Sequence, residues 1–332
     1  MLKLEKISYK ADDRLLVENI SLQAKAGKTT VLLGPSGSGK STLLKVIAGI
    51  AKQESGRILY HKKDISNLKT AARSIGYVSQ NPSLLPFLKI WQNISLAIRA
   101  NKKTQEAKAR KLLLENDLLE YADAYPQQLS IGQQQQISII RAIAAEAKIL
   151  LFDEPYANLD LKNKDKLLNQ TIELCKKNSA IKILVTHNPY EAMIAADYIY
   201  VMNQGLIMSQ GTTKELYDYP DNEFIAKLFG LANILEQDQA RKIIGKNAQN
   251  TGKDCAISED IKYVIRPHNI VISAATQSSK HKAIIENKKF YYGKNLYYLT
   301  SLNKQLKLQV ISNEDFNVGD ECAYKILSYS CY

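Results

Sequence analysis

Short apolar runs alternate with longer amphipathic stretches through the first two thirds of the chain. The short runs predict buried strands, and they occupy residues 30–33, 75–80, 149–154 and 181–187. Between them, apolar residues recur at helical spacing, and these stretches occupy residues 43–48, 91–119, 135–147 and 161–177. Strands that alternate with helices predict a mostly parallel sheet.

Other segments predict antiparallel pairing. Residues 2–8 and 20–24 alternate polar and apolar positions, which indicates exposed antiparallel strands, and residues 56–60 add another short strand. Residues 198–210 have the pattern of a hairpin with Asn203-Gln204-Gly205 at its turn. The first part of the chain therefore predicts an α/β domain with an antiparallel β part and a helical part.

The pattern changes near residue 235. Residues 236–260 are polar and charged with little periodicity, which predicts a linker. From Lys262 onward short strands and turns follow one another, which predicts a small all-β, barrel-like domain. The sequence therefore predicts a domain over residues 1–235, a linker over 236–260 and a β domain over 261–332.

Composition and charge narrow the class of protein. The 332 residues are 45% hydrophobic, which suffices for a real core in one large or two smaller domains. No run reaches the roughly 18 apolar residues that cross a bilayer, and the first residues lack the apolar core of a signal peptide. We therefore expect a cytoplasmic protein. The formal net charge of +12 would suit nucleic acid or an anionic membrane surface, but its lysines are scattered and indicate neither strongly.

The four cysteines predict neither a metal site nor a disulfide framework. They form no C-x-x-C pair and lie away from histidines at metal-ligand spacing. We therefore expect free, reduced thiols at Cys175, Cys255, Cys322 and Cys331.

A glycine-rich segment between the strand at 30–33 and the helix at 43–48 carries the clearest chemistry. Glycines let successive backbone N–H groups point at phosphate oxygens, and the following helix adds the positive end of its dipole. In this pattern Lys40 would reach the β- and γ-phosphates and the Ser41 hydroxyl would ligate Mg²⁺. The segment therefore predicts a nucleoside triphosphate site, and it comprises Gly34, Pro35, Ser36, Gly37, Ser38, Gly39, Lys40, Ser41 and Thr42.

Polar side chains close three further strands of the expected parallel sheet, where such sheets bind ligands. Asp153 would hold Mg²⁺, and Glu154 would orient or deprotonate an attacking water. Gln80 could bridge Mg²⁺ and a moving loop, and His187 could hydrogen-bond the γ-phosphate. A helix-capping role for the acidic pair, a simple turn at Gln80 and a structural histidine remain the alternatives.

These residues occur in the order found in a known family. The chain resembles the ATP-binding subunits of ABC transporters from residue 1 to about 235, and the Leu-Ser-x-Gly-Gln element is the most specific part of the match. The motifs that carry the resemblance are residues 34–42, Gln80, residues 129–133, residues 149–155, residues 158–160 and Thr186-His187.

The resemblance implies a fold, a dimer and roles for single residues. It implies a phosphate-loop ATPase fold and two cassettes facing head to tail, with ATP between the phosphate loop of one and Ser130, Gly132 and Gln133 of the other. The implied roles are adenine stacking by Tyr9, phosphate and Mg²⁺ binding by Lys40 and Ser41, a coupling loop at Gln80, a catalytic base at Glu154, a cross-subunit contact at Asp160 and a γ-phosphate contact at His187.

One position departs from the family pattern, and the tail carries a second resemblance. Ile131 stands where the family usually has a second glycine, and a β-branched residue there restricts the backbone near the partner's nucleotide. Residues 229–233 and 265–270 resemble the junction and start of the small β domain of importer subunits, called TOBE. This resemblance favours an importer over an exporter.

The resemblance implies the cytoplasmic ATPase subunit of a prokaryotic-type importer, peripheral on the inner membrane. Its implied cofactors are ATP and Mg²⁺. Its implied partners are a second ATPase subunit, expected to be identical, two membrane permease subunits and, indirectly, an external solute-binding protein. Ferric iron is the favoured solute, followed by sulfate or molybdate, polyamine and sugar.

Three alternatives stay open. An exporter-type cassette and a nucleic-acid ATPase share the same motifs. The nucleic-acid class inserts a long coiled coil or zinc modules between the phosphate loop and the signature, whereas fewer than 100 residues separate Lys40 from Ser130 here. We therefore expect no nucleic-acid partner. Thirdly, the tail could bind a regulatory ligand through His268, Asn269 and the Tyr291-Tyr292 pair.

Overall fold

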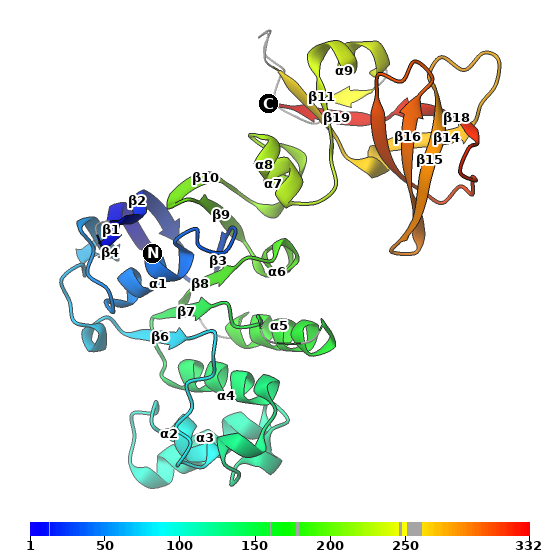
Figure 1. Ribbon diagram of the computed structural model, residues 1–332. Coiled ribbons are helices and arrows are strands. Elements are labelled where there is room, and N and C mark those ends of the chain that lie inside the picture. Colours follow the sequence, from blue (N-terminus) through cyan, green and yellow to red (C-terminus); the bar gives the residue numbers. More distant parts are fainter. Residues whose placement is uncertain (13, 158, 160, 177–178, 246–247, 251–260) are drawn as a thin grey trace. The chain divides into compact units, whose positions relative to one another are not determined.

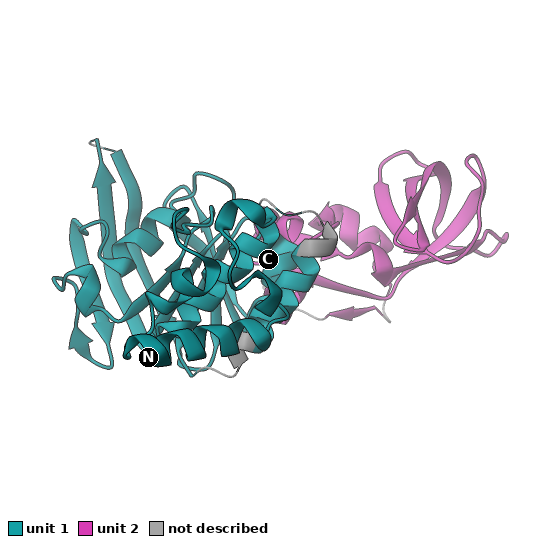
Figure 2. Ribbon diagram, turned by 90° about the horizontal axis from the view of Figure 1, so that it is seen from below, with its two compact units in different colours: residues 1–213 teal, residues 214–332 magenta. Residues whose placement is uncertain are grey.

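The computed structural model describes residues 1–332 except residues 13, 158, 160, 177–178, 246–247 and 251–260. The described chain forms two compact units, Met1–Thr213 and Lys214–Tyr332, which Figure 2 colours separately. We describe each unit by itself.

A six-stranded sheet organises the first unit (Figure 1). Five of its strands run parallel and the edge strand β10 is antiparallel, which confirms the expected mixed, mostly parallel sheet. In spatial order the strands are β10 (Leu206–Gly211), β9 (Tyr198–Asn203), β3 (Thr29–Leu33), β8 (Ile181–Thr186), β7 (Ile149–Asp153) and β6 (Ile75–Val78).

The strand that we expected over 75–80 is shorter. It ends at Val78, where its pairing with β7 ends at Phe152, so Gln80 lies in the following loop. The predicted hairpin is present, since β9 and β10 pair around Gln204 and Gly205, whose φ angles are 47° and 80°.

Helices lie on both faces of the six-stranded sheet (Figure 1). Helix α1 (Lys40–Ala48) packs on one face together with a separate antiparallel sheet, and one core cluster joins Leu44 of α1 to Leu32 and Leu151 of the strands. Helices α5 (Leu161–Lys176) and α6 (Pro189–Ala195) lie on the other face. The antiparallel sheet has the order β2 (Arg14–Ala24), β1 (Leu2–Ala11), β4 (Ser55–Tyr60) and β5 (Lys63–Asp64).

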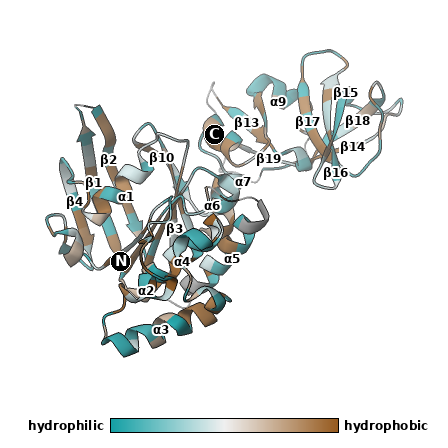
Figure 3. Ribbon diagram, turned by 60° about the horizontal axis from the view of Figure 1, so that its bottom comes forward, coloured by the Kyte–Doolittle hydropathy of each residue, from teal (hydrophilic) through white to brown (hydrophobic). Residues whose placement is uncertain are grey.

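A helical part follows β6. The stretch expected to be helical over 91–119 forms two helices, α2 (Ile90–Ser95) and α3 (Lys102–Leu114), which pack with α4 (Ile131–Ala144) around Ile94, Leu113 and Ile137. Hydrophilic and hydrophobic residues share the surface of α3 (Figure 3), and Ala109 and Leu113 are its buried positions. The 3₁₀ turns Leu119–Tyr121 and Pro126–Gln128 complete this region, and a further 3₁₀ turn, Thr70–Ala72, precedes β6.

The second unit is rich in strands, as expected. Its five-stranded sheet brings the edge strands β14 and β17 into contact with each other, which gives it a barrel-like form. That sheet has the order β14 (Ile270–Ala274), β18 (Glu321–Ile326), β15 (Lys282–Tyr291), β16 (Lys294–Ser301) and β17 (Lys307–Ser312). A second sheet has the order β11 (Asn233–Glu236), β13 (Lys262–Ile265), β19 (Ser328–Cys331) and β12 (Gln249–Asn250).

Regular structure enters the range expected to be a linker. Helix α9 (Gln237–Ile243) lies there and buries Ala240 and Ile243 in the core of the second unit. Helices α7 (Thr213–Asp218) and α8 (Glu223–Leu228) precede β11, and a 3₁₀ turn at Pro267–Asn269 joins β13 to β14. Only a few apolar residues of α9 reach the core, so the sequence showed too little periodicity to reveal this helix.

The expectation that all four cysteines are free thiols is wrong for one of them. Cys331 is disulfide-bonded, so the expectation of four free thiols is wrong. Cys322 is free and buried, and burial raises the pKa of its thiol to about 11. Among the described residues no helix is both long and apolar enough to span a membrane.

Candidate functional site

The glycine-rich segment forms a loop between β3 and α1, as the sequence predicts. A Cβ atom at Gly34 would lie 2.0 Å from the carbonyl oxygen of Met202, so only glycine lets the loop pass this strand. Gly39 precedes α1 with a φ of 93°, in the left-handed region that favours glycine. The glycines thus allow the tight curvature that a phosphate-binding backbone needs.

Lys40 lies at the start of α1 with its ammonium turned into the loop. Its Nζ donates to the carbonyl oxygens of Gly34 (2.9 Å) and Pro35 (2.7 Å) and to the Ser38 hydroxyl (3.2 Å). The side chain is buried, and burial lowers its pKa while the nearby carboxylates of Glu154 and Asp153 oppose that shift. A cation held inside an N–H-rich loop suits a polyanionic ligand.

Ser41 and Asp153 meet although they are far apart in the sequence. The Ser41 hydroxyl donates to Asp153 Oδ1 over 2.6 Å, and the Tyr77 hydroxyl donates to Asp153 Oδ2 over 2.8 Å. Burial and the neighbouring Asp153 charge raise the pKa of Tyr77, which keeps its phenol protonated as a donor. The two predicted magnesium ligands therefore lie together, and a tyrosine fixes the carboxylate between them.

Glu154 and His187 form a second pair at the same edge of the sheet. His187 Nδ1 lies 2.9 Å from Glu154 Oε2, so the residues that directly follow β7 and β8 contact each other. Glu154 has a φ of 45°, an uncommon backbone angle for glutamate, and its N–H donates to the Val185 carbonyl. Strained backbone of this kind often occurs at functional sites.

The signature segment caps helix α4. The Ser130 hydroxyl accepts from the Gln133 N–H (3.3 Å), and the Gln133 side chain accepts from the Ser130 N–H (2.9 Å), so the two form a capping box. Ser130 is exposed and Ile131 is 56% exposed. The segment therefore lies on the surface of the first unit, where a second molecule could reach it.

The remaining predicted residues lie in different surroundings. Gln80 is exposed in its loop, and helix α4 contacts that loop through Gln135, which donates to the Ser79 carbonyl (3.1 Å), and Arg141, which donates to the Ser83 carbonyl (2.8 Å). Tyr9 lies on β1, partly buried against the core of the first unit. Asp160 falls outside the described residues.

Sequence reasoning missed two polar residues beside the site. Tyr77 holds Asp153, and buried Glu191 accepts from Thr186, the residue before His187, over 2.5 Å. In the register of β6 against β7, Tyr77 lies opposite Leu151, two residues before Asp153. This register would have indicated Tyr77, but a single sequence does not reveal register. No local signal marks Glu191.

The described side chains do not by themselves form a metal cage. No group of three or more metal-ligating His, Cys, Asp or Glu residues occurs within the described part of the chain. A hydroxyl and one carboxylate nevertheless fit Mg²⁺, which usually takes one or two protein oxygens and completes its shell with water and substrate phosphates. The edge of the sheet thus combines a phosphate cradle, hard oxygen ligands and a carboxylate–histidine pair, an arrangement suited to phosphoanhydride hydrolysis.

A family model and several known proteins resemble this chain, and their names refer to ABC transporters or to import ATP-binding proteins. The family model described as ABC transporter matches residues 17–157. Spermidine/putrescine import ATP-binding protein PotA of Acetivibrio thermocellus is 36% identical, covering 81% of this chain and 79% of its own. Fe(3+) ions import ATP-binding protein FbpC of Fusobacterium nucleatum is 34% identical, covering 93% and 85%. Sulfate/thiosulfate import ATP-binding protein CysA of Mesostigma viride is 36% identical, covering 95% and 92%.

Solved structures agree with the sequence relatives. The dimeric ATP-binding cassette MJ0796, in a post-hydrolysis state bound to ADP and Pi, has a TM-score of 0.58 at 28% identity over 64% of this chain and 99% of its own. The cbiO1 protein of Clostridium perfringens, part of the ABC transporter complex cbiONQ, has a TM-score of 0.60 at 29% identity over 65% and 89%. The chain therefore belongs to the ABC transporter family, as an ATP-binding subunit of the importer type.

Proposed function

We propose that the chain is the ATP-hydrolysing subunit of an ABC import complex and couples ATP binding and hydrolysis to solute uptake. As an ABC ATP-binding subunit it is an ATPase. The observation that carries the proposal is the meeting of Ser41 with Asp153 beside the Glu154–His187 pair, at the mouth of the phosphate loop. The import function of the three named relatives supports uptake over export or work on nucleic acid.

Binding of ATP falls to the phosphate loop in this proposal. The backbone N–H groups of residues 34–42 and the Lys40 ammonium bind the phosphates, and Tyr9 stacks on the adenine. Lys40 then exchanges its carbonyl partners in the loop for phosphate oxygens. Ser41 and Asp153, with Gln80, would hold Mg²⁺, which would neutralise charge on the β- and γ-phosphates.

Hydrolysis then depends on Glu154 and His187. Glu154 orients a water and accepts its proton, because a carboxylate at this edge faces the γ-phosphate. His187 donates a hydrogen bond to the γ-phosphate and holds Glu154 in place through the contact at 2.9 Å. Both side chains follow strands of one rigid sheet, so their positions need little reorganisation during the reaction.

A second copy completes the site. The chain carries one phosphate loop and one signature segment, so a head-to-tail pair would bring Ser130, Gly132 and Gln133 of one copy to the ATP of the other, with Asp160 as a cross-subunit contact. The N–H groups at the start of α4 suit the γ-phosphate. The dimeric state of the MJ0796 cassette supports such a pair.

Membrane subunits supply the path for the solute. We propose two permease subunits that contact the segment after Gln80, with the chain peripheral on the cytoplasmic face of the inner membrane and the solute delivered by an external binding protein. We propose residues 1–235 as the ATPase domain, residues 236–260 as the linker and residues 261–332 as the TOBE-like domain. Ferric iron stays our first choice of solute, ahead of sulfate or molybdate, polyamine and sugar. The named relatives, at 34–36% identity, do not separate these solutes.

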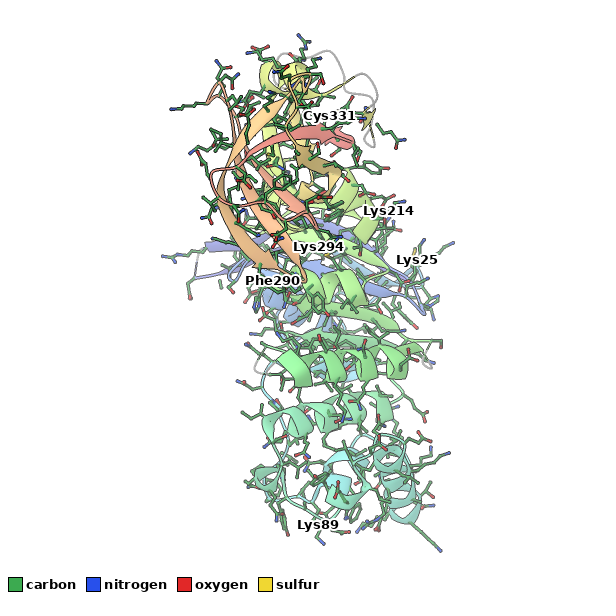
Figure 4. All side chains as sticks on the ribbon, turned by 90° about the vertical axis from the view of Figure 1, so that its right-hand side faces the viewer. Lys25, Lys89, Lys214, Phe290, Lys294 and Cys331 are labelled. Atoms are coloured by element: carbon green, nitrogen blue, oxygen red, sulfur yellow. The ribbon has the colours of Figure 1, made fainter. Side chains whose placement is uncertain are left out.

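The proposal is tested by steady-state phosphate release from the purified chain. Glu154→Gln should lower kcat by about 100-fold or more, the scale of a lost general base, and retain ATP binding. Lys40→Met should lose ATP binding itself. Lys214→Met, which removes an exposed lysine of the second unit (Figure 4), is the matched control and should match the unsubstituted chain. A Glu154→Gln rate equal to that of the unsubstituted chain would contradict the assigned base.

A further inference from the structure

A buried ion pair lies directly behind the turn that carries His187. The Glu191 side chain on α6 is 4% exposed, and the Lys164 side chain on α5 is 14% exposed. Lys164 Nζ lies 3.0 Å from Glu191 Oε1. Helices α5 and α6 are neighbours on one face of the sheet (Figure 1), and this pair joins them.

Glu191 also holds both residues that flank His187. Its Oε2 accepts from the Thr186 hydroxyl over 2.5 Å, and its Oε1 accepts weakly from the Asn188 amide over 3.4 Å. The Asn188 N–H in turn donates to the Thr186 hydroxyl over 3.0 Å. The turn is therefore fixed on both sides of the histidine by a single carboxylate.

This turn sets where the imidazole lies. The His187 side chain is itself about half exposed, and its ring nitrogen Nδ1 contacts Glu154. The orientation of the ring then depends on the backbone of Thr186 and Asn188. Fixing those two residues fixes the distance from His187 to Glu154.

The lysine gives the turn a connection to a second part of the molecule. Lys164 lies in the first turn of α5, which begins directly after the segment that contains Asp160. A carboxylate buried without its cation is costly, so Glu191 stays in place only while Lys164 remains beside it. A displacement of the start of α5 would therefore reach the histidine turn through this pair.

We propose that Glu191 and Lys164 are positioning residues for hydrolysis, which hold His187 against Glu154 and connect that contact to the start of α5. The inference rests on the function proposed above for Glu154 and His187. Neither residue touches the nucleotide in this scheme. They act through the turn between β8 and α6.

The test compares steady-state ATPase kinetics with the NMR signal of the His187 ring. Glu191→Gln and Lys164→Met should each lower kcat about tenfold, the scale of coupling through a packed network, with KM for ATP within about twofold. Lys164→Arg should restore most of the rate. The double variant should be no slower than the slower single variant, because the pair acts as one unit. In every slow variant the His187 ring resonance, identified by its loss in His187→Gln, should shift.

A matched control separates positioning from stability. Lys28→Met breaks another ion pair of the first unit, between Lys28 and Asp197 at 2.8 Å, near the opposite ends of the strands. It should leave both kcat and the His187 resonance unchanged. The inference would be overturned if kcat of Lys164→Met lay within twofold of kcat of Lys28→Met. It would also be overturned if the His187 resonance did not shift in Lys164→Met. An unsubstituted chain without ATPase activity would overturn the proposed function instead, and the NMR comparison would still report on the turn.

Discussion

At the scale of single residues, Asp153 connects the phosphate loop to the sheet. It ends a strand whose five residues are all buried, and its two oxygens accept from Ser41 and Tyr77. The serine belongs to the phosphate loop and the tyrosine to a neighbouring strand. The carboxylate is thus oriented before any ligand arrives, which lowers the cost of binding a metal ion there.

Removing the tyrosine hydroxyl tests that orientation. Tyr77→Phe should raise the Mg²⁺ concentration for half-maximal ATPase activity about tenfold, since a hydrogen bond to a charged group contributes roughly 1.5–3 kcal/mol. Tyr200→Phe is the matched control, because its buried hydroxyl contacts Gln23 instead of the site. An Mg²⁺ titration of Tyr77→Phe that overlays the Tyr200→Phe titration would contradict the role of Tyr77.

Ile131 raises a different question at the same scale. It occupies the first position of α4 with its side chain 56% exposed, so it needs no space in the core. Ile131→Gly restores the residue usual in the family, and we expect an ATPase rate no lower than that of the unsubstituted chain. A marked loss of phosphate release in this variant would mean that isoleucine is adapted to its partner surface.

At the scale of elements, regular patterns were predictable and tertiary partners were not. The alternation of apolar strands and amphipathic helices predicted the parallel sheet. The repeat of apolar residues in a strand or a helix involves only residues close together in the sequence, so it can be recognised without the structure. The same reasoning marked 91–119 as helical without locating the break between α2 and α3, and it overlooked α9, where few apolar residues repeat. The strand-end rule predicted that Asp153, Glu154 and His187 would lie at one edge of the sheet beside Ser41, whereas Tyr77 and Glu191 depend on contacts across strands and turns.

One arginine illustrates such a contact in the second unit. Arg266 is buried, and its guanidinium donates to the carbonyl oxygens of Ala226 (2.8 Å) and Tyr217 (2.7 Å) while it stacks over the Tyr217 ring. It therefore joins α7 and α8 to β13. Burial lowers its pKa, with the nearby Tyr217 and Asp218 opposing the shift.

Arg266→Met should consequently destabilise the second unit. Two or more buried carbonyl groups would lose their donor, at roughly 1–3 kcal/mol each, so we expect a loss of about 3 kcal/mol in unfolding free energy. Urea unfolding monitored by circular dichroism provides the measurement. Lys227→Met, which removes an exposed cation on α8, is the control. Equal stability of the two variants would show that Arg266 does not hold the helices to the sheet.

At the scale of the whole molecule, the proposed import function requires a surface that transmits ATP-driven motion to membrane subunits. The segment after Gln80 exposes apolar side chains, with Phe87 70% exposed and Leu85 36% exposed. Helix α4 contacts the same loop through Gln135 and Arg141, so the signature helix and this segment are mechanically linked. Exposed apolar residues at such a place favour a protein partner.

Charges placed on that segment should abolish assembly with the permease. Leu85→Asp with Phe87→Asp should remove permease subunits from affinity-purified complexes and leave nucleotide binding within about twofold, because apolar contacts near the centre of an interface carry much of its energy. Phe290→Asp is the matched control, since Phe290 is 80% exposed near the end of the β15–β16 hairpin in the second unit (Figure 4). Complexes that assemble normally with the double variant would disprove this contact.

The most direct measurement captures the complete complex. The Glu154→Gln chain, loaded with ATP and used to purify partners from gently solubilised membranes, should retain a multi-helix permease that mass spectrometry can identify. Slow hydrolysis in this variant should prolong the ATP-bound, assembled state. The permease sequence would then indicate the class of solute. If the purified chain instead retains nucleic acid and no membrane protein, the transporter account is contradicted, and the charge of +12 becomes the feature to explain.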